Sequence, residues 1–296
     1  MADTIPVLFD TDIGNDIDDA VALAYLLRQP RCELLGVTTA TGDVVKRAGL
    51  VEVICRAAGR DDVPIHAGVV GPLLHGTEQG VAQYSAIESV PHRTDYPTGA
   101  ALGFLADTIR SRPGEIVLLA TGPLTNIGLL FAADPGLPAL LKAFYWMGGV
   151  FTAKSGHGPG AKEWNALLDP VATALTLRWG GPLTAVGLDV TMKCQLPAAE
   201  CRHRFAQAEP LATVLRQAEV WFTRVPEITF HDPLAAALIF EPDLCTLQNG
   251  TIRSELGPSE GEGLTRWKPD PGGTHRIAID VNPAAFFEHY FAVTGG

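Results

Sequence analysis

The chain has 296 residues, a formal net charge of −11 at pH 7, 47% hydrophobic residues and 19% charged residues. The negative charge argues against nucleic acid or an anionic membrane as the main partner, and the apolar content is too high for a disordered chain. We therefore expect a folded protein, but the charge does not identify its substrate. The length allows one large domain or two smaller ones, and we predict a single domain over residues 1–296 because no repeat or Pro/Ser-rich linker interrupts the chain.

The cysteines and the first residues bear on the compartment. The five cysteines are scattered without a Cys-x-x-Cys pair, which favours reduced thiols in a cytoplasmic protein. The first predicted strand begins at Ile5, so we expect no secretory signal, and no apolar run reaches the roughly 18 residues that span a bilayer.

Apolar runs and helical patterns alternate along the chain. Strands are predicted at 5–9, 33–39, 64–67, 116–120, 143–147, 183–188, 251–256 and 276–281. Helices are predicted at 20–27, 44–58, 100–110, after 126, at 169–178, twice within 198–224, at 231–240 and from 282 onward. This alternation suits βαβ units, so we expect an α/β fold: one open, mostly parallel, Rossmann-like sheet flanked by helices.

Polar clusters follow the predicted strands or begin the predicted helices. They lie at 10–19, 41–43, 121–126, 148–165 and 231–232. Ligands of open α/β sheets bind beyond the carboxyl ends of the strands. The clusters are therefore expected to converge on one edge of the sheet.

The first cluster, Asp10-Thr-Asp-Ile-Gly-Asn-Asp-Ile-Asp-Asp19, holds five aspartates in ten residues between a strand and a helix. Carboxylates about 4 Å apart repel by roughly 1–4 kcal/mol, and the helix N-terminus returns only about 0.3–1 kcal/mol each. The turn is thus either splayed into water or holds a hard cation. Gly14 is misplaced for an EF-hand, and it occupies the Thr/Val position of a haloacid dehalogenase phosphatase, although Asp10-x-Asp12 fits that motif.

Five motifs occur together and in order. They are Phe-Asp-Thr-Asp-x-Gly…Asp-Asp-Ala-x-Ala-Leu at 9–23, Ala-Thr-Gly-Pro-Leu-Thr-Asn-Ile at 120–127, Met-Gly-Gly at 147–149, Glu-Trp-Asn at 163–165 and His-Asp-Pro-Leu-Ala at 231–235. This set resembles the signatures of the inosine–uridine type nucleoside hydrolases, over roughly residues 5–240. The resemblance implies an open α/β fold, a homodimer or homotetramer, and purine or pyrimidine salvage.

The resemblance also implies one Ca²⁺ at the carboxyl edge of the sheet. Its ligands would be Asp12, Asp19, the main-chain carbonyl of Thr125 and Asp232. Carboxylate and carbonyl oxygens suit this cation.

The implied reaction is hydrolysis of the N-glycosidic bond of a ribonucleoside to free base and ribose. Asp12 would be the general base for a calcium-bound water, and His231 would assist the leaving base. Substrate contacts are expected from Asp16, Asp18, Asp43, His157, Glu163, Trp164 and Asn165.

This chain departs from the family pattern at several of these positions. The acidic turn is two residues longer than the usual Gly-x-Asp-Asp, so either Asp16 or Asp18 could contact the ribose. Asp43 and His157 stand where the family commonly has asparagine. These two substitutions support one alternative, a metal-bound ribosyl-binding protein with little turnover. A second alternative is a Mg²⁺-dependent phosphatase with Asp10 as nucleophile.

Overall fold

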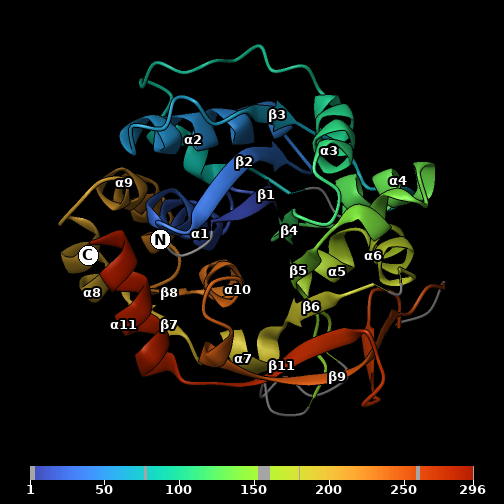
Figure 1. Ribbon diagram of the computed structural model, residues 1–296. Coiled ribbons are helices and arrows are strands. Elements are labelled where there is room, and N and C mark those ends of the chain that lie inside the picture. The colour runs from blue at the N-terminus through green and yellow to red at the C-terminus, as the bar shows by residue number, and fades with distance from the viewer. Residues whose placement is uncertain (1–3, 77–78, 153–160, 180, 258–260, 296) are drawn as a thin grey trace.

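A nine-stranded sheet forms the centre of the molecule (Figure 1). The computed structural model describes residues 4–76, 79–152, 161–179, 181–257 and 261–295. The strands, in their order across the sheet, are β10 (Thr265–Pro269), β9 (Cys245–Ser254), β11 (His275–Val281), β6 (Leu183–Val186), β5 (Ala143–Met147), β4 (Val117–Ala120), β1 (Ile5–Thr11), β2 (Cys32–Thr39) and β3 (Ile65–Ala67). The strands from β11 to β3 pair in parallel, and β9 runs antiparallel to both of its neighbours.

Helices cover both faces of the sheet, as Figure 1 shows. One side carries α1 (Asp18–Arg28), α9 (Leu211–Phe222), α10 (His231–Leu238) and α11 (Pro283–Thr294). The other side carries α3 (Ala100–Ser111), α4 (Thr125–Ala133) and α6 (Pro170–Leu177). The remaining helices are α2 (Val44–Ala57), α5 (Trp164–Leu168), α7 (Leu188–Thr191) and α8 (Ala198–Phe205).

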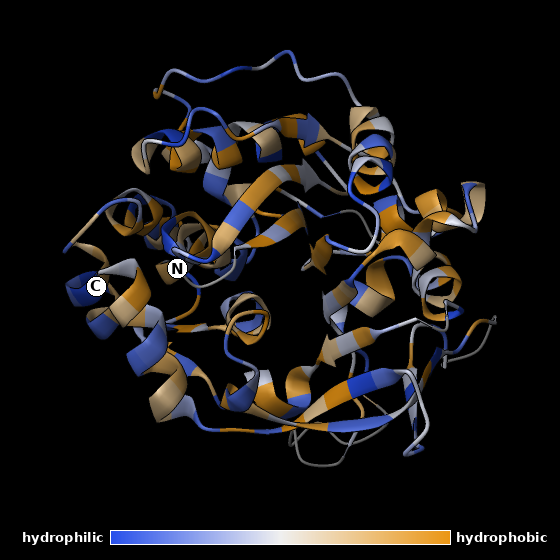
Figure 2. Ribbon diagram, in the orientation of Figure 1, coloured by the Kyte–Doolittle hydropathy of each residue, from blue (hydrophilic) through white to orange (hydrophobic). Residues whose placement is uncertain are grey.

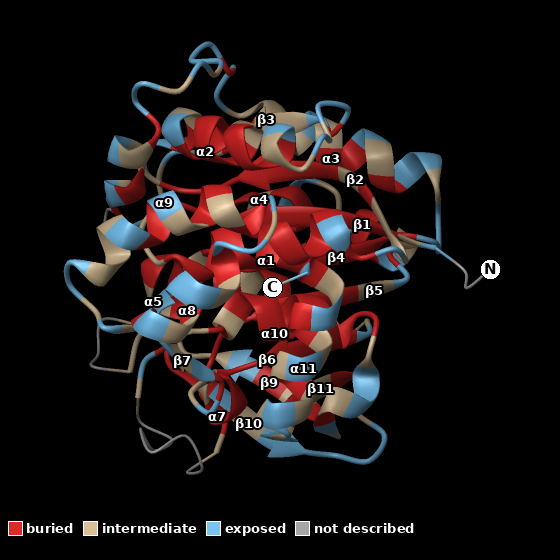
Figure 3. Cartoon of the chain, turned by 90° about the vertical axis from the view of Figure 1, so that its left-hand side faces the viewer, coloured by how far each residue is buried: buried red, intermediate tan, exposed pale blue. Residues whose placement is uncertain are grey.

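Burial is deepest in the central strands and in α1 and α10. Ten of the eleven residues of α1, from Asp18 to Leu27, are buried, as is every residue of β4. Figure 2 shows apolar residues concentrated in the central strands, and Figure 3 shows α1 and α10 buried among the outer helices. A helix buried on all sides needs apolar residues all round, which explains the run Ala20–Leu27.

The structure confirms the predicted fold class: an open, mostly parallel sheet flanked by helices. The prediction did not include β10, nor the small antiparallel pair of β7 (Gln195–Pro197) and β8 (Glu227–Thr229). These strands have three to five residues, too few for an alternating pattern to stand out. The predicted strand 251–256 overlaps the last four residues of the ten-residue β9, which begins earlier, at Cys245, and ends at Ser254.

The carboxyl ends of the central strands lie level with one another. Asp10 of β1 pairs with both Thr38 of β2 and Ala120 of β4, and Ala120 pairs with Trp146 of β5. The polar segments that follow these strands therefore emerge at the same edge. Within the described residues, the helices are all too short or too polar to cross a membrane.

Candidate active site

A cavity of about 360 Å³ opens at this edge of the sheet. It is lined mainly by polar and aromatic residues that follow β1, β4 and β5 or lie at the starts of α1, α5 and α10. The lining residues are Asp12, Asn15, Asp16, Asp18, Asp19, Gln79, Thr121, Met147, Lys162, Glu163, Trp164, Asn165, Leu188, Trp221, His231 and Asp232. The expected convergence of polar clusters therefore occurs, except that 41–43 contributes no lining residue.

The acidic turn between β1 and α1 is anchored by buried apolar residues. Ile13 and Ile17 are fully buried, so the side chains between and after them are held in place. Gly14 has a φ of +121°, and a Cβ there would lie 2.5 Å from a methyl carbon of Val81 and 2.7 Å from one of Leu50. Only glycine fits this backbone and this contact. The turn thus presents its carboxylates from a fixed backbone.

Three carboxylates form a tight group at the bottom of the turn. Asp18, Asp19 and Asp232 are buried, and one oxygen from each lies within 4.8 Å of the others. The main-chain N–H of Asp232 donates to Asp18 over 3.2 Å, which joins α10 to α1. Asp19 accepts hydrogen bonds from the hydroxyls of Thr11 and Thr121. An all-oxygen, anionic donor set of this kind fits a hard cation such as Ca²⁺ or Mg²⁺.

The pKa shifts of these carboxylates also indicate a cation site. Burial raises the pKa of Asp18 well above its usual range, and repulsion from Asp16 and Asp19 raises it further. Burial and neighbouring carboxylates likewise raise the pKa of Asp19 and of Asp232. Burial also raises the pKa of Asp16, to about 6. Charged carboxylates are thus costly here unless a cation balances them.

Arg47 of α2 lies directly behind the acidic turn and is fully buried. Its guanidinium donates to the main-chain carbonyls of Asp12, of Ile13 over 2.7 Å and of Thr41 over 2.8 Å. Burial raises the pKa of Asp12, whereas the charge of Arg47 lowers it. The guanidinium therefore both shapes the turn and offsets part of its negative charge.

The opposite wall of the cavity comes from the segment that begins α5. Glu163 caps this helix: its carboxylate accepts main-chain N–H groups of Asn165 over 2.8 Å and of Ala166 and Gly149 over 3.0 Å. The amide of Asn165 donates to the carbonyls of Thr121 over 2.6 Å and of Met147 over 3.2 Å. These bonds tie the wall to the ends of β4 and β5. Both side chains line the same cavity as the acidic turn.

Aromatic and imidazole side chains line the rest of the cavity. Trp164 is 47% exposed, and Trp221 donates its ring N–H to the carbonyl of Glu227 over 2.8 Å. His231 begins α10, next to Asp232, and its Nδ1 lies 2.7 Å from the hydroxyl of Thr191. A titratable imidazole and two indole rings therefore face the same space as the carboxylates.

Some predicted site residues lie in positions that their predicted roles did not specify. Asp12 was predicted as a metal ligand and Asp18 as a substrate contact. In the structure Asp18 belongs to the tight carboxylate group, and Asp12 lies beside this group. Thr125 donates its hydroxyl to Asp169 and does not line the cavity. Asp43 caps α2 and pairs with Lys46, also away from the cavity. The predicted contact His157 lies outside the described residues.

Asp10 has a structural position. It is fully buried and accepts hydrogen bonds from the hydroxyl of Thr38 and, over 2.7 Å, from the amide of Asn126. It therefore links β1 to β2 and α4 and does not line the cavity. A phosphatase would need this carboxylate exposed to its substrate, so the phosphatase alternative is wrong.

Arg47 and Gln79 are among the residues of the site that were not predicted. Arg47 lies on the same helical stripe as Val44, Ala48 and Val51, all buried, so a cation on an apolar stripe was a usable signal. Gln79 follows the loop-like His75-Gly76 and lines the cavity. No sequence pattern marks Gln79, because its position depends on how the 79–96 segment packs.

Comparisons with known proteins agree with this geometry. A family model described as inosine-uridine preferring nucleoside hydrolase matches residues 7–288. The pyrimidine-specific ribonucleoside hydrolase RihA of Citrobacter koseri is 29% identical over 279 residues, covering 88% of this chain and 87% of that protein. Uridine nucleosidase 1 of Arabidopsis thaliana is 28% identical over 282 residues, covering 88% of this chain and 83% of that protein.

Solved structures are similar over almost the whole chain. The purine-preferring ribonucleoside hydrolase from Gardnerella vaginalis matches with a TM-score of 0.81 and 23% sequence identity, covering 98% of each chain. This likeness supports the fold.

The family model confirms the resemblance predicted from the motifs, together with the enzyme class, a hydrolase of ribonucleoside N-glycosidic bonds. The chain belongs to the inosine–uridine preferring nucleoside hydrolase family.

Proposed function

We propose that this protein hydrolyses ribonucleosides to free base and ribose in the 360 Å³ cavity, with one calcium ion held by Asp18, Asp19 and Asp232. The observation that carries the proposal is this group of three buried carboxylates facing Glu163 and Asn165. By family resemblance, Asp12 is a further ligand. A bound ion would supply a fixed positive charge that polarises oxygen ligands.

The acidic wall suits a reaction in which positive charge develops on the sugar. As the C–N bond breaks, the anomeric carbon becomes cationic, and surrounding carboxylates stabilise it. Asp12 takes a proton from the attacking water, since it lines the cavity and burial raises its pKa, which makes it a better proton acceptor, while the charge of Arg47 limits that rise. Asp16, Glu163 and Asn165 bind the ribose hydroxyls, because they ring the same cavity.

The leaving base requires a different environment. Trp164 and Trp221 present ring faces that stack on a base, and the imidazole of His231 lines the same cavity, so it is the group placed to donate a proton to the base. His231 is oriented by Thr191 at its other ring nitrogen. Both sequence relatives above are named for pyrimidine ribonucleosides, so uridine and cytidine are the first substrates to test.

The setting of the enzyme is part of the proposal. The five cysteines are all free thiols, which supports a reducing, cytoplasmic compartment. Assembly into a homodimer or homotetramer is proposed from the family resemblance.

The test is hydrolysis by protein stripped of metal with EDTA and then given calcium or magnesium. Uridine, cytidine, inosine and guanosine are the substrates, and free ribose and free base are measured separately. We expect equal amounts of both, restored by calcium. Asp19→Asn should remove activity and calcium binding, whereas Asp107→Asn, the same chemical change on the exposed face of α3, should keep both.

Three results would contradict the proposal. Release of no base from any nucleoside by the calcium-loaded protein would exclude this substrate class. Full activity in EDTA would exclude the ion from the reaction. Normal calcium binding by Asp19→Asn would place the ion elsewhere.

A further inference from the structure

Gln79 lies where the acidic turn, the β2–α2 turn and the cavity meet. It lines the cavity and is 8% exposed. Its main-chain carbonyl packs on Gly42, where an added Cβ would lie only 2.4 Å from that oxygen. Gln79 therefore occupies the space next to the β2–α2 turn, where the sequence predicted a substrate contact from Asp43.

The two ends of the Gln79 amide have different surroundings. Its side-chain amide lies against Asp12 and lowers the pKa of that carboxylate, and since a carboxylate only accepts, the amide N–H is the end that faces it. The amide oxygen, Oε1, is buried and accepts no hydrogen bond from any described residue. A buried acceptor without a donor costs about 1–3 kcal/mol. The free oxygen of a cavity-lining side chain is thus suited to a donor that arrives with the substrate.

The segment that carries Gln79 is held by its neighbours. The main-chain N–H of Gln83 donates to the carbonyl of Gly14 over 3.0 Å, and its side-chain amide donates to the carbonyl of Asn15 over 3.1 Å. These bonds dock residues 79–83 on the acidic turn. The position of Gln79 relative to Asp12 is therefore set by the fold.

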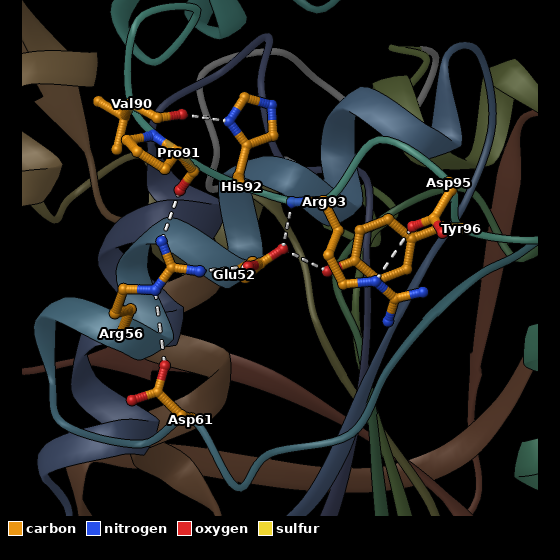
Figure 4. Close-up of polar contacts among 9 residues, drawn as sticks. All are labelled: Glu52, Arg56, Asp61, Val90, Pro91, His92, Arg93, Asp95 and Tyr96. Carbon is orange, nitrogen blue, oxygen red and sulfur yellow. Dashed lines mark hydrogen bonds and ion pairs between the residues drawn. The ribbon is translucent and has the colours of Figure 1, made fainter.

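The far end of the segment is fastened to α2, as Figure 4 shows. Glu52 accepts the main-chain N–H of Arg93 over 2.8 Å and the hydroxyl of Tyr96 over 2.7 Å. Arg56, which pairs with Glu52, also donates to the carbonyl of Pro91. Because α2 also carries Arg47, one helix supports both the acidic turn and the segment packed on it.

We propose that Gln79 positions the attacking water, holding it together with Asp12; this rests on the proposed function. The amide of Gln79 lies against the carboxylate of Asp12. A molecule that donates a hydrogen bond to Oε1 of Gln79 is therefore also close to Asp12. A water molecule donates one proton to each acceptor, which leaves a lone pair free to attack the anomeric carbon.

The step balances without any change in Gln79. The water oxygen forms a bond to the anomeric carbon as the C–N bond breaks, and that electron pair leaves with the base. Asp12 takes one water proton. The other proton stays on the new sugar hydroxyl and keeps its hydrogen bond to Gln79 during attack. Gln79 is thus a positioning residue that touches the nucleophile.

The experiment compares Gln79→Met with Gln29→Met in the calcium-loaded protein. Both changes replace a buried glutamine with an apolar side chain of similar length, but Gln29 lies at the C-terminal end of α1, bonded to Tyr25 and Arg31, and does not line the cavity. We measure kcat and KM on the best nucleoside, inhibition by free ribose, calcium binding by calorimetry, and Tm.

We expect kcat of Gln79→Met to fall by roughly 10- to 100-fold, because a positioned water is lost. KM, the inhibition constant of ribose and calcium affinity should each stay within about threefold of wild type, since sugar and ion contacts remain. Gln29→Met should lower Tm, because the bonds to Tyr25 and Arg31 are lost, and keep kcat within about threefold.

Other results overturn the inference. An unchanged kcat in Gln79→Met removes the role. A rise in KM and in the ribose inhibition constant at constant kcat would make Gln79 a sugar contact instead. Parallel losses of kcat, calcium affinity and Tm in both variants would make its role structural. If the wild type cleaves no nucleoside, the proposed function itself fails, whereas an active wild type with an equally active Gln79→Met contradicts the inference alone.

Discussion

Replacing Arg47 by methionine tests whether a buried cation holds the acidic turn. Methionine keeps much of the side-chain length but removes the charge and the donors to Asp12, Ile13 and Thr41. Removing one partner of a buried charged arrangement costs about 3–5 kcal/mol. In Arg47→Met, three buried main-chain carbonyls each lose a charged donor. The loss of unfolding free energy should therefore be at least of this order before the turn relaxes.

We therefore expect the free energy of unfolding of Arg47→Met to be lower than that of wild type by about 3–5 kcal/mol. Arg47→Lys keeps the charge but not the forked donors, so we expect roughly half that loss. Urea unfolding in EDTA measures the difference, because metal-free protein prevents a bound ion from masking it.

A matched control lies on the same helix. Arg56 is partly exposed, so Arg56→Met should cost about 1 kcal/mol or less. The reasoning is refuted if Arg47→Met loses no more stability than Arg56→Met. It is also refuted in part if Arg47→Lys is as unstable as Arg47→Met, since the charge would then contribute nothing.

Three further predictions concern the carboxylates. Asp19→Asn should weaken calcium binding on the order of 100-fold or more in calorimetry, because it removes a charge from the ligand group. Calcium should displace protons from the metal-free protein, since burial raises the pKa values of Asp18, Asp19 and Asp232; a binding heat that does not vary with the ionisation enthalpy of the buffer would contradict this. Burial raises the pKa of Asp10 from 3.8 to about 7, so its stabilising effect is complete below about pH 4 and is lost as the pH rises through 7. Between pH 5 and pH 8, metal-free wild type should lose about 3 kcal/mol of unfolding free energy relative to Asp10→Asn; parallel pH curves of the two proteins would refute the assignment.

The sequence was sufficient to predict the sheet and the edge that carries the site. Buried strands such as Val117–Ala120 are short apolar runs, and parallel strands present their carboxyl ends at one edge whatever their exact register. That is why residues as distant as Asp18, Glu163 and Asp232 could be expected together. Local patterns and one topological rule were enough for this part.

The division of roles within the acidic turn could not be predicted, because it depends on tertiary contacts. Asp16 and Asp18 both line the cavity, but only Asp18 is in the tight group, where the N–H of Asp232 bonds to it. Gln79 acts through the packing of a segment that sequence periodicity does not place, whereas the stripe of α2 marks Arg47 as buried but not which carbonyls it contacts. The position of Asp43 also depends on local capping, because this carboxylate caps its own helix and does not line the cavity.

The bond between Asp18 and Asp232 joins residues 214 positions apart in the sequence. During synthesis on the ribosome, the acidic turn emerges long before Asp232 does, and the three-carboxylate group does not yet exist. Partly made or C-terminally truncated chains therefore lack this site, even where the first strands have already formed. Loading with a cation at these residues would report that the chain has been completed and folded through α10.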